Sequence, residues 1–196
     1  MSSEREHPAS RLEAFSDGIF AVIITITVIE MKGPIGSSLS SLWPIVPVAF
    51  AYVLSFVFLM IYWNNHHHLL RHVHETTPSV MWANAHLLFW LSLTPFVTIW
   101  LGENGGALWP TVIYGAVLLC SGIAYYILEI LIVSAHDSDS HLARTVGADR
   151  KGQLSVAIYA LAIAGAFVST WISYALFVAV ALVWIVPDKR FKEAIE

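Results

Sequence analysis

Charge is scarce in this chain of 196 residues, because Asp, Glu, Lys and Arg together make up only 12% of it. A soluble domain carries roughly 25% charged residues, so the composition excludes an ordinary water-soluble globule and a disordered polar chain. Cysteine is represented by Cys120 alone, so no disulfide can form within the chain, which excludes a small disulfide scaffold. The net charge of −4 is too small for a protein that binds nucleic acid through its electrostatic field.

Apolar sequence takes the place of the missing charge. Hydrophobic residues make up 57% of the chain, and the mean hydropathy is +0.69. Four stretches of 38, 27, 25 and 36 residues contain no Asp, Glu, Lys or Arg. Because a helix that crosses a membrane needs about 20 apolar residues, the sequence predicts an all-α integral membrane protein. The four stretches lie between Lys32 and Arg71, Glu75 and Glu103, Glu103 and Glu129, and Lys151 and Asp188.

Six transmembrane helices fit these stretches, in a single domain that spans residues 1–196. The last stretch allows either two short crossings or one long helix. With six crossings and both termini in the cytoplasm, nine of the ten basic residues fall on the cytoplasmic side, as the positive-inside rule expects. We therefore predict six crossings, with a turn near Ser169–Thr170. The predicted helices span residues 14–31, 40–63, 79–101, 107–134, 153–169 and 171–187.

Tryptophan and proline positions refine this topology. Indole rings prefer the two membrane interfaces, and seven of the eight tryptophans fall near a predicted helix end; Trp43, for example, lies near an outer end and Trp63 near an inner end. Pro95 lacks the backbone N–H that a helix interior needs. We therefore expect a kink in the outer half of the third crossing.

Asp17 lies about one turn inside the first predicted helix. An unpaired carboxylate at the centre of a bilayer costs about 2.5–3.5 kcal/mol, and less near an interface, so Asp17 should face protein or water and have a partner. The guanidinium of Arg11 could reach it, and Ser16 adds a neighbouring hydroxyl. This cluster fits a structural anchor at the helix end, a direct role in transport, or both.

The same helix carries a stripe of residues at helical spacing, formed by Phe15, Gly18, Val22, Thr25 and Ile29. Residues three and four apart share one face of a helix. A mostly apolar stripe with one glycine and one hydroxyl is typical of a helix-packing surface. It would equally suit the lining of a narrow pore that branched side chains close.

Five histidines lie between residues 66 and 74, at the inner end of the second predicted helix. His68 and His72 have the i, i+4 spacing of two metal ligands on one helical face. The other histidines, such as His86, are scattered, and no paired acidic residues complete a site. We therefore predict no metal site and no enzyme, and expect one or two of these histidines to donate hydrogen bonds to Asp17.

Several of these residues together resemble the signature of the transmembrane protein 175 family of potassium channels. The Arg-x-x-x-Phe-Ser-Asp string at the start of the first helix carries most of the likeness, and features of the second and third helices add to it. The matching residues are Arg11, Phe15, Ser16 and Asp17, then Trp63, His66 and His67, and then Asn84 with Pro95 and Phe96.

This resemblance implies a homotetramer of six-helix subunits in the bacterial cytoplasmic (inner) membrane, permeable to potassium and other monovalent cations and without a cofactor. In that family the first helices line the central pore, and a ring of bulky aliphatic side chains narrows it. The matching constriction here is Val22, followed by Thr25 and Ile29, with Gly18 on the same stripe. Val22 is smaller than the isoleucine or leucine expected there, so the ring would be wider or Ile26 would share in the seal.

Nothing in the chain resembles the Thr-Val-Gly-Tyr-Gly filter of ordinary potassium channels. Weak selectivity follows as an expectation, with a ring of Thr25 hydroxyls as its source. The main alternative is a proton-conducting or proton-coupled transporter that uses Asp17 and the cluster His66–His68. A histidine-ligated metal or haem enzyme and a purely structural membrane protein are the other classes that the residues leave open.

Overall fold

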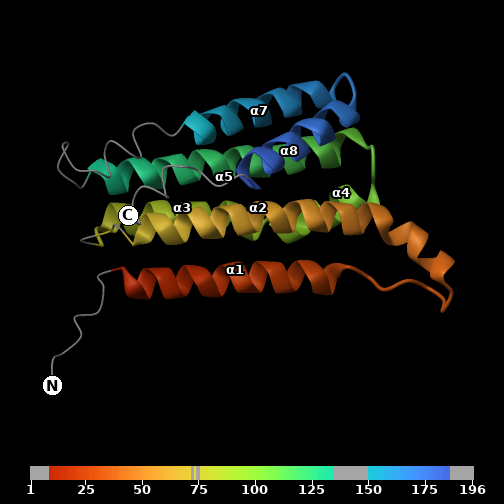
Figure 1. The fold of residues 1–196 in the computed structure, drawn as a ribbon, viewed down its shortest axis with the longest axis horizontal. Helices are drawn as coiled ribbons and strands as arrows, with labels where there is room; N and C mark the ends of the chain where they lie inside the picture. Colours follow the sequence, from red (N-terminus) through yellow and green to blue (C-terminus); the bar gives the residue numbers. More distant parts are fainter. Residues whose placement is uncertain (1–8, 72, 74–75, 135–149, 186–196) are drawn as a thin grey trace.

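The structure is a computed structural model that describes residues 9–71, 73, 76–134 and 150–185, and within these ranges every regular element is a helix. The helices lie side by side along one axis in an elongated bundle (Figure 1). The elements are α1 (Ser10–Glu30), the 3₁₀ helix η1 (Leu39–Ile45), α2 (Val46–Leu70), α3 (Pro78–Ser92), α4 (Thr94–Glu103), α5 (Leu108–Ser134), α7 (Arg150–Ala166) and α8 (Thr170–Ile185).

These elements make six crossings, as the sequence predicted. The α1, η1–α2, α3–α4 and α5 segments are each long and apolar enough to cross a membrane. The other two crossings, α7 and α8, have 17 and 16 residues. They are separate helices, because the chain turns between Ala166 and Thr170, where the Ser169 N–H donates to the Gly165 carbonyl at 2.9 Å. The predicted turn is confirmed, and the alternative of a single long helix in this region is excluded.

The second crossing differs from the predicted 40–63 at both ends. Its first residues form η1, which contains Pro44, and α2 begins at Val46 with Pro47 in its first turn. At the other end α2 continues through the polar residues 64–68 to the buried Leu69 and Leu70. The prediction ended the helix where the polar residues begin, whereas these residues continue the helix and carry contacts to α1 and α3 described below.

The third crossing is interrupted at Leu93, between α3 and α4. Pro95 has no N–H to donate and its ring collides with the carbonyl four residues earlier, so the helix cannot run through this point unbroken. The Leu93 N–H instead donates to the Trp90 carbonyl at 3.2 Å, one residue tighter than in an α-helix. The distortion of this crossing that Pro95 predicted is confirmed.

The packing of the bundle divides into two buried clusters. One joins α1 to the second half of α2, α3 and the end of α5, with Phe20, Leu87 and Leu128 among its members. The other joins the first half of α2 to α4, α5, α7 and α8, with Phe58 and Phe177 among its members. α1 lies at one edge of the bundle, where it packs on α2, α3 and α4, and α7 lies at the opposite edge (Figure 1).

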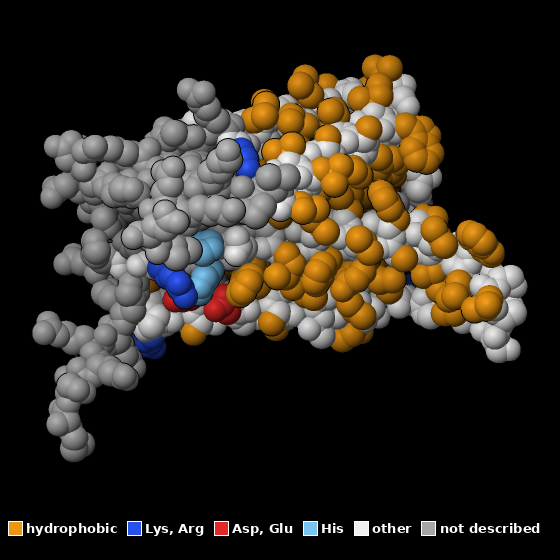
Figure 2. Space-filling model, in the orientation of Figure 1, with side chains coloured by type: hydrophobic (Ala, Val, Ile, Leu, Met, Phe, Trp, Pro, Cys, Tyr) orange, Lys and Arg blue, Asp and Glu red, His pale blue; other side chains and the backbone are white. Residues whose placement is uncertain are grey.

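The surface matches a protein immersed in lipid. On the face drawn in Figure 2, hydrophobic side chains cover the middle of the helices, and the coloured charged and histidine side chains lie mostly toward the end where α1 begins. We call this end the N-terminal end of the bundle. Large apolar residues are exposed on every described crossing, among them Phe50 on α2, Phe96 on α4 and Leu161 on α7.

Close backbone contact between α4 and α2 gives the fold a testable weak point. A Cβ added at Gly102 would lie 2.5 Å from Cα of Val48, which backbone atoms can relieve only by moving apart. We expect Gly102→Ala to destabilise the protein by about 1–3 kcal/mol, the usual cost of overpacking, measured as a lower thermal unfolding midpoint in detergent. Gly105→Ala is the matched control, because its added Cβ would meet Pro47 at an ordinary 3.8 Å; equal midpoints for the two variants would contradict the prediction.

Candidate functional site

α1 presents two different faces. Ser16, Phe20, Ile23 and Thr27 are its buried residues, and their spacing of four, three and four places them on one side of the helix, against the bundle. The stripe that the sequence analysis singled out lies on the other side. All its members are exposed, as is the neighbouring Ile26; they are Phe15, Gly18, Val22, Thr25 and Ile29. This stripe therefore does not pack within the subunit, and the intrasubunit packing surface is the Ser16 face.

A chain of hydrogen bonds fastens the buried face of α1 to α2 and α3. His66 Nε2 lies 2.6 Å from Oδ1 of Asn84, the Asn84 amide donates to Oγ of Ser16 at 3.0 Å, and Ser16 Oγ donates to the Leu12 carbonyl at 2.8 Å. The amide oxygen of Asn84 can only accept a hydrogen bond, so Nε2 of His66 must carry the proton that it donates. His66, Asn84 and Ser16 are at most 1% exposed, so this chain lies in a medium of low dielectric, where satisfied hydrogen bonds are strong.

A second contact joins α1 and α2 closer to the surface. The Trp63 indole N–H donates to Oδ1 of Asp17 at 2.8 Å. One turn further along α2, Nδ1 of His67 lies 2.6 Å from Oε1 of Glu13. The Trp63 and His67 rings stack on each other with centroids 5.9 Å apart. Two carboxylates one turn apart on α1 thus meet two aromatic N–H groups one turn apart on α2.

The expected partners of Asp17 are corrected by this geometry. We expected a histidine to donate to Asp17, but the described donor is the Trp63 indole, while His66 bonds to Asn84 and His67 to Glu13. Within the described residues Arg11 is exposed, and no hydrogen bond or ion pair joins it to Asp17. The guanidinium therefore stays at the surface, and the indole satisfies the carboxylate.

Glu13 is the site residue that the sequence reasoning missed. A signal for it was present, because Glu13 and Asp17 are four residues apart on one face, as are Trp63 and His67 on theirs. The two pairs contact each other only when α1 and α2 lie side by side in the right register. The sequence of either helix alone does not predict that register.

The rest of the histidine cluster forms no metal centre among the described residues, since no three His, Cys, Asp or Glu side chains there come together. His68 belongs to α2 and its ring contacts that of His67. His72 lies outside the described residues, as do His136 and His141. His86 of α3 instead accepts from the indole of Trp90, on the same helix, at 2.9 Å.

An apolar groove of about 1090 Å³ runs between α1 and the α3–α4 crossing. Val22, Ile26 and Gly18 form part of its wall on α1, and Phe96 and Trp100 form part of the wall on α4. The face of α1 that carries the stripe therefore opens into a space that no part of the described subunit fills.

These features define a class of protein: a multi-pass membrane protein of six crossings in which polar residues of three helices hold one edge helix in a fixed rotation. The comparisons with known proteins agree. Residues 11–95 match the family described as the endosomal/lysosomal potassium channel TMEM175. That range includes every residue of the two polar contacts described above, the hydrogen-bond chain through Asn84 and the pairs Trp63–Asp17 and His67–Glu13.

Full-length relatives extend the match. A potassium channel of Chryseobacterium sp. (strain P1-3) is 46% identical over 186 residues, which cover 95% of this chain and 97% of the relative. A potassium channel of Chamaesiphon minutus is 28% identical, with 88% and 91% of the two chains covered. The crystal structure of a lysosomal potassium-selective channel TMEM175 homolog from Chamaesiphon minutus superposes with a TM-score of 0.81 at 27% identity, over 91% of this chain and 96% of that one. The chain belongs to the TMEM175 family of potassium channels, which are not enzymes.

Asn84 offers a direct test of the hydrogen-bond chain. Asn84→Ala would leave His66 Nε2 and Ser16 Oγ buried without this partner, and an unsatisfied buried polar group costs about 1–3 kcal/mol. We expect a clearly lower unfolding midpoint in detergent for this variant. Asn104→Ala is the matched control, because Asn104 is exposed and its amide donates only to the Trp100 carbonyl one turn earlier. A midpoint unchanged by Asn84→Ala would show that the chain contributes nothing to stability.

Proposed function

We propose that this protein is a weakly selective, potassium-permeable cation channel in which four copies of α1 line a central pore. The observation that carries the proposal is the pair of faces on α1: a buried face that packs on its own subunit and is hydrogen-bonded to it through Ser16, and an uncharged, mostly apolar stripe left exposed. A helix whose rotation is fixed in this way can present the same side chains to a symmetry axis in every subunit.

The interior of one subunit argues for a path between subunits rather than through one. Both clusters in the bundle are packed with aliphatic and aromatic side chains. The buried hydroxyls of Ser55, Thr98 and Tyr114 bond to one another at 2.7 and 2.9 Å, so they hold α2, α4 and α5 together instead of lining a path. The names of the relatives describe potassium channels, and a pore on the tetramer axis reconciles that activity with a packed subunit.

Along such a pore Val22 would form the narrowest ring. Branched apolar side chains at a constriction stop conduction by excluding water, and Ile26 and Ile29 lie within two turns on the same exposed side. Thr25 Oγ donates its proton to the Ala21 carbonyl at 2.8 Å, which leaves oxygen lone pairs for a passing cation. One hydroxyl ring replaces little of a hydration shell, so selectivity for potassium over sodium would be weak.

The proposed membrane orientation follows from the basic residues. With both termini in the cytoplasm, nine of the ten Lys and Arg residues lie on that side. The N-terminal end of the bundle would then face the cytoplasm, and the protein would lie in the inner membrane of a bacterium. The anchoring contacts around Asp17 and Asn84 would hold α1 at its cytoplasmic end.

Ion flux in liposomes tests the pore assignment. We expect Val22→Ala to raise the potassium flux driven by a potassium gradient, because a smaller side chain widens the ring and makes it easier to wet. We expect Thr25→Val to lower the ratio of potassium to sodium flux, because it removes the hydroxyl and keeps the shape. Leu161→Ala is the control, since Leu161 is 62% exposed, close to the 55% of Val22, but lies on α7, at the opposite edge.

Unchanged flux and selectivity in both α1 variants, with wild-type flux intact, would remove these residues from the pore. Proton flux that is lost in Asp17→Asn while the particle stays assembled would favour the proton-conducting alternative instead.

The assembly is tested separately. We expect light scattering of the purified particle, corrected for detergent, to give four times the 21.7 kDa of one chain. A particle with the mass of a single chain would exclude a pore built from several copies of α1.

A further inference from the structure

The segment that joins α1 to α2 contains an exposed apolar surface that the pore does not use. In η1, Leu39 is 86% exposed, Leu42 48% and Trp43 75%, and Ile35 just before it is fully exposed. Figure 1 shows η1 projecting beyond the end of the bundle opposite the N-terminal end, and Figure 2 shows hydrophobic side chains on this projection. Soluble proteins rarely leave a contiguous apolar patch of this kind uncovered.

η1 has an apolar row, and hydroxyls lie beside it. In a 3₁₀ helix residues three apart eclipse one another, so Leu39, Leu42 and Ile45 form one row. Ser41 lies on a different side of the helix, and its hydroxyl is 3.1 Å from that of Ser38, the extended residue just before η1. The segment is therefore amphipathic, although it carries no charge from residue 33 to residue 45.

The position of η1 relative to the lipid bilayer follows from the length of α2. The helical rise from Trp43 to Trp63 is about 30 Å, the thickness of the hydrocarbon core of a bilayer. Polar residues begin immediately after Trp63, at Asn64, which marks one boundary of that core. The other boundary then falls at Trp43, and the residues before it lie at the level of the lipid headgroups.

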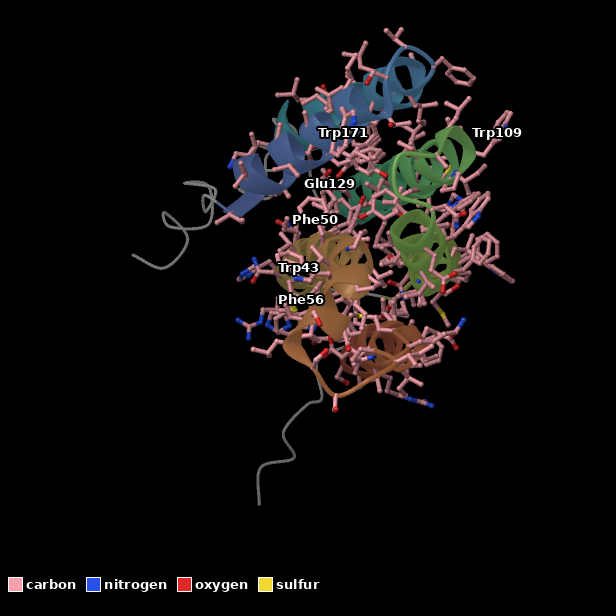
Figure 3. The ribbon with its side chains drawn as sticks, turned by 90° about the vertical axis from the view of Figure 1, so that its right-hand side faces the viewer. Trp43, Phe50, Phe56, Trp109, Glu129 and Trp171 are labelled. Atoms are coloured by element: carbon pink, nitrogen blue, oxygen red, sulfur yellow. The ribbon has the colours of Figure 1, made fainter. Side chains whose placement is uncertain are left out.

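The apolar row of η1 continues an outward-facing stripe of α2. Val46, Phe50 and Val53 are each about half exposed, and with Leu42 they recur at steps of four, four and three, which keeps them on one side of the helix. Figure 3, which looks along the bundle from this end, labels Trp43 and Phe50 on the same flank of α2. The surface that meets acyl chains on α2 thus runs without interruption into η1.

We propose that η1 docks on the lipid leaflet at this end of the bundle, with its leucine row at the boundary between acyl chains and headgroups and the exposed Ser38 at its N-cap toward water. An uncharged amphipathic helix with tryptophan at its edge fits a lipid interface, and its lack of Lys and Arg means that it needs no anionic lipid. This inference depends on membrane insertion and not on conduction, so it stands or falls separately from the proposed pore.

Spin labels on the full-length protein in phosphatidylcholine vesicles test the docking. The chain has one native cysteine, so Cys120→Ala provides a background into which Leu42→Cys and the matched control Ser38→Cys are introduced. We expect the ratio of oxygen to nickel-chelate accessibility to be several-fold higher at position 42 than at position 38, because oxygen concentrates in lipid and the chelate in water. Leu39→Cys, on the same row, replaces Leu42→Cys if the latter does not give the wild-type elution volume.

Two results would overturn the proposal. High accessibility of position 42 to the nickel chelate would show that the leucine row stands in water. Low accessibility of position 42 to both reagents, with an immobilised spectrum, would show that protein covers the row, as a neighbouring copy of the chain would.

Discussion

The amide of Asn84 is the group on which the placement of α1 depends. It accepts from His66 on α2 and donates to Ser16 on α1, so one side chain on α3 joins three helices. A buried polar group left without a partner costs free energy in a low-dielectric interior, and this cost acts on the rotation of α1 as well as on its position. Turning the helix by one residue, about 100°, would replace the Ser16 hydroxyl with Phe15 or with the carboxylate of Asp17. The rotation that satisfies Asn84 is also the one that leaves Val22 and Thr25 exposed.

In the proposed channel, one part of the subunit lines the pore and another part supports it. In the half that contains α7 and α8, Phe177 is fully buried against the ring of Tyr114 at a centroid distance of 5.3 Å, and hydrogen bonds join the two helices: Ser173 donates to the Ala162 carbonyl at 2.7 Å, and the Trp184 indole donates to the Ser155 hydroxyl at 2.8 Å. The half that contains α1 combines apolar packing with the directional contacts of Asp17, His67 and Asn84. Dispersion and burial fix a helix loosely in rotation, whereas hydrogen bonds fix it closely, and α1 is the helix whose rotation the proposed pore needs.

Much of the fold could be read from the sequence because membrane insertion imposes strong local rules. Runs without charge located the crossings, Pro95 located the break in the third one, and the distribution of basic residues separated α7 from α8. The end of α2 was predicted too early, because residues 64–68 are polar yet helical, and their contacts to α1 and α3 are not visible in that segment alone. The partner of Asp17 was predicted wrongly for a related reason: Trp63 and the nearby histidines offer similar N–H groups, and helix rotation decides which one arrives.

The charge-free parts of the described helices differ in length, and this has a consequence for the surrounding lipid. Residues 108–128 of α5 carry no Asp, Glu, Lys or Arg, and neither do residues 152–166 of α7, so one edge of the subunit offers about 22 Å of apolar helix beside about 32 Å on α5. A bilayer of uniform thickness cannot match both, so lipid must thin locally along the α7–α8 edge or the long helix must tilt. Acyl-chain length would then act on one flank of each subunit and favour membranes whose thickness suits that edge.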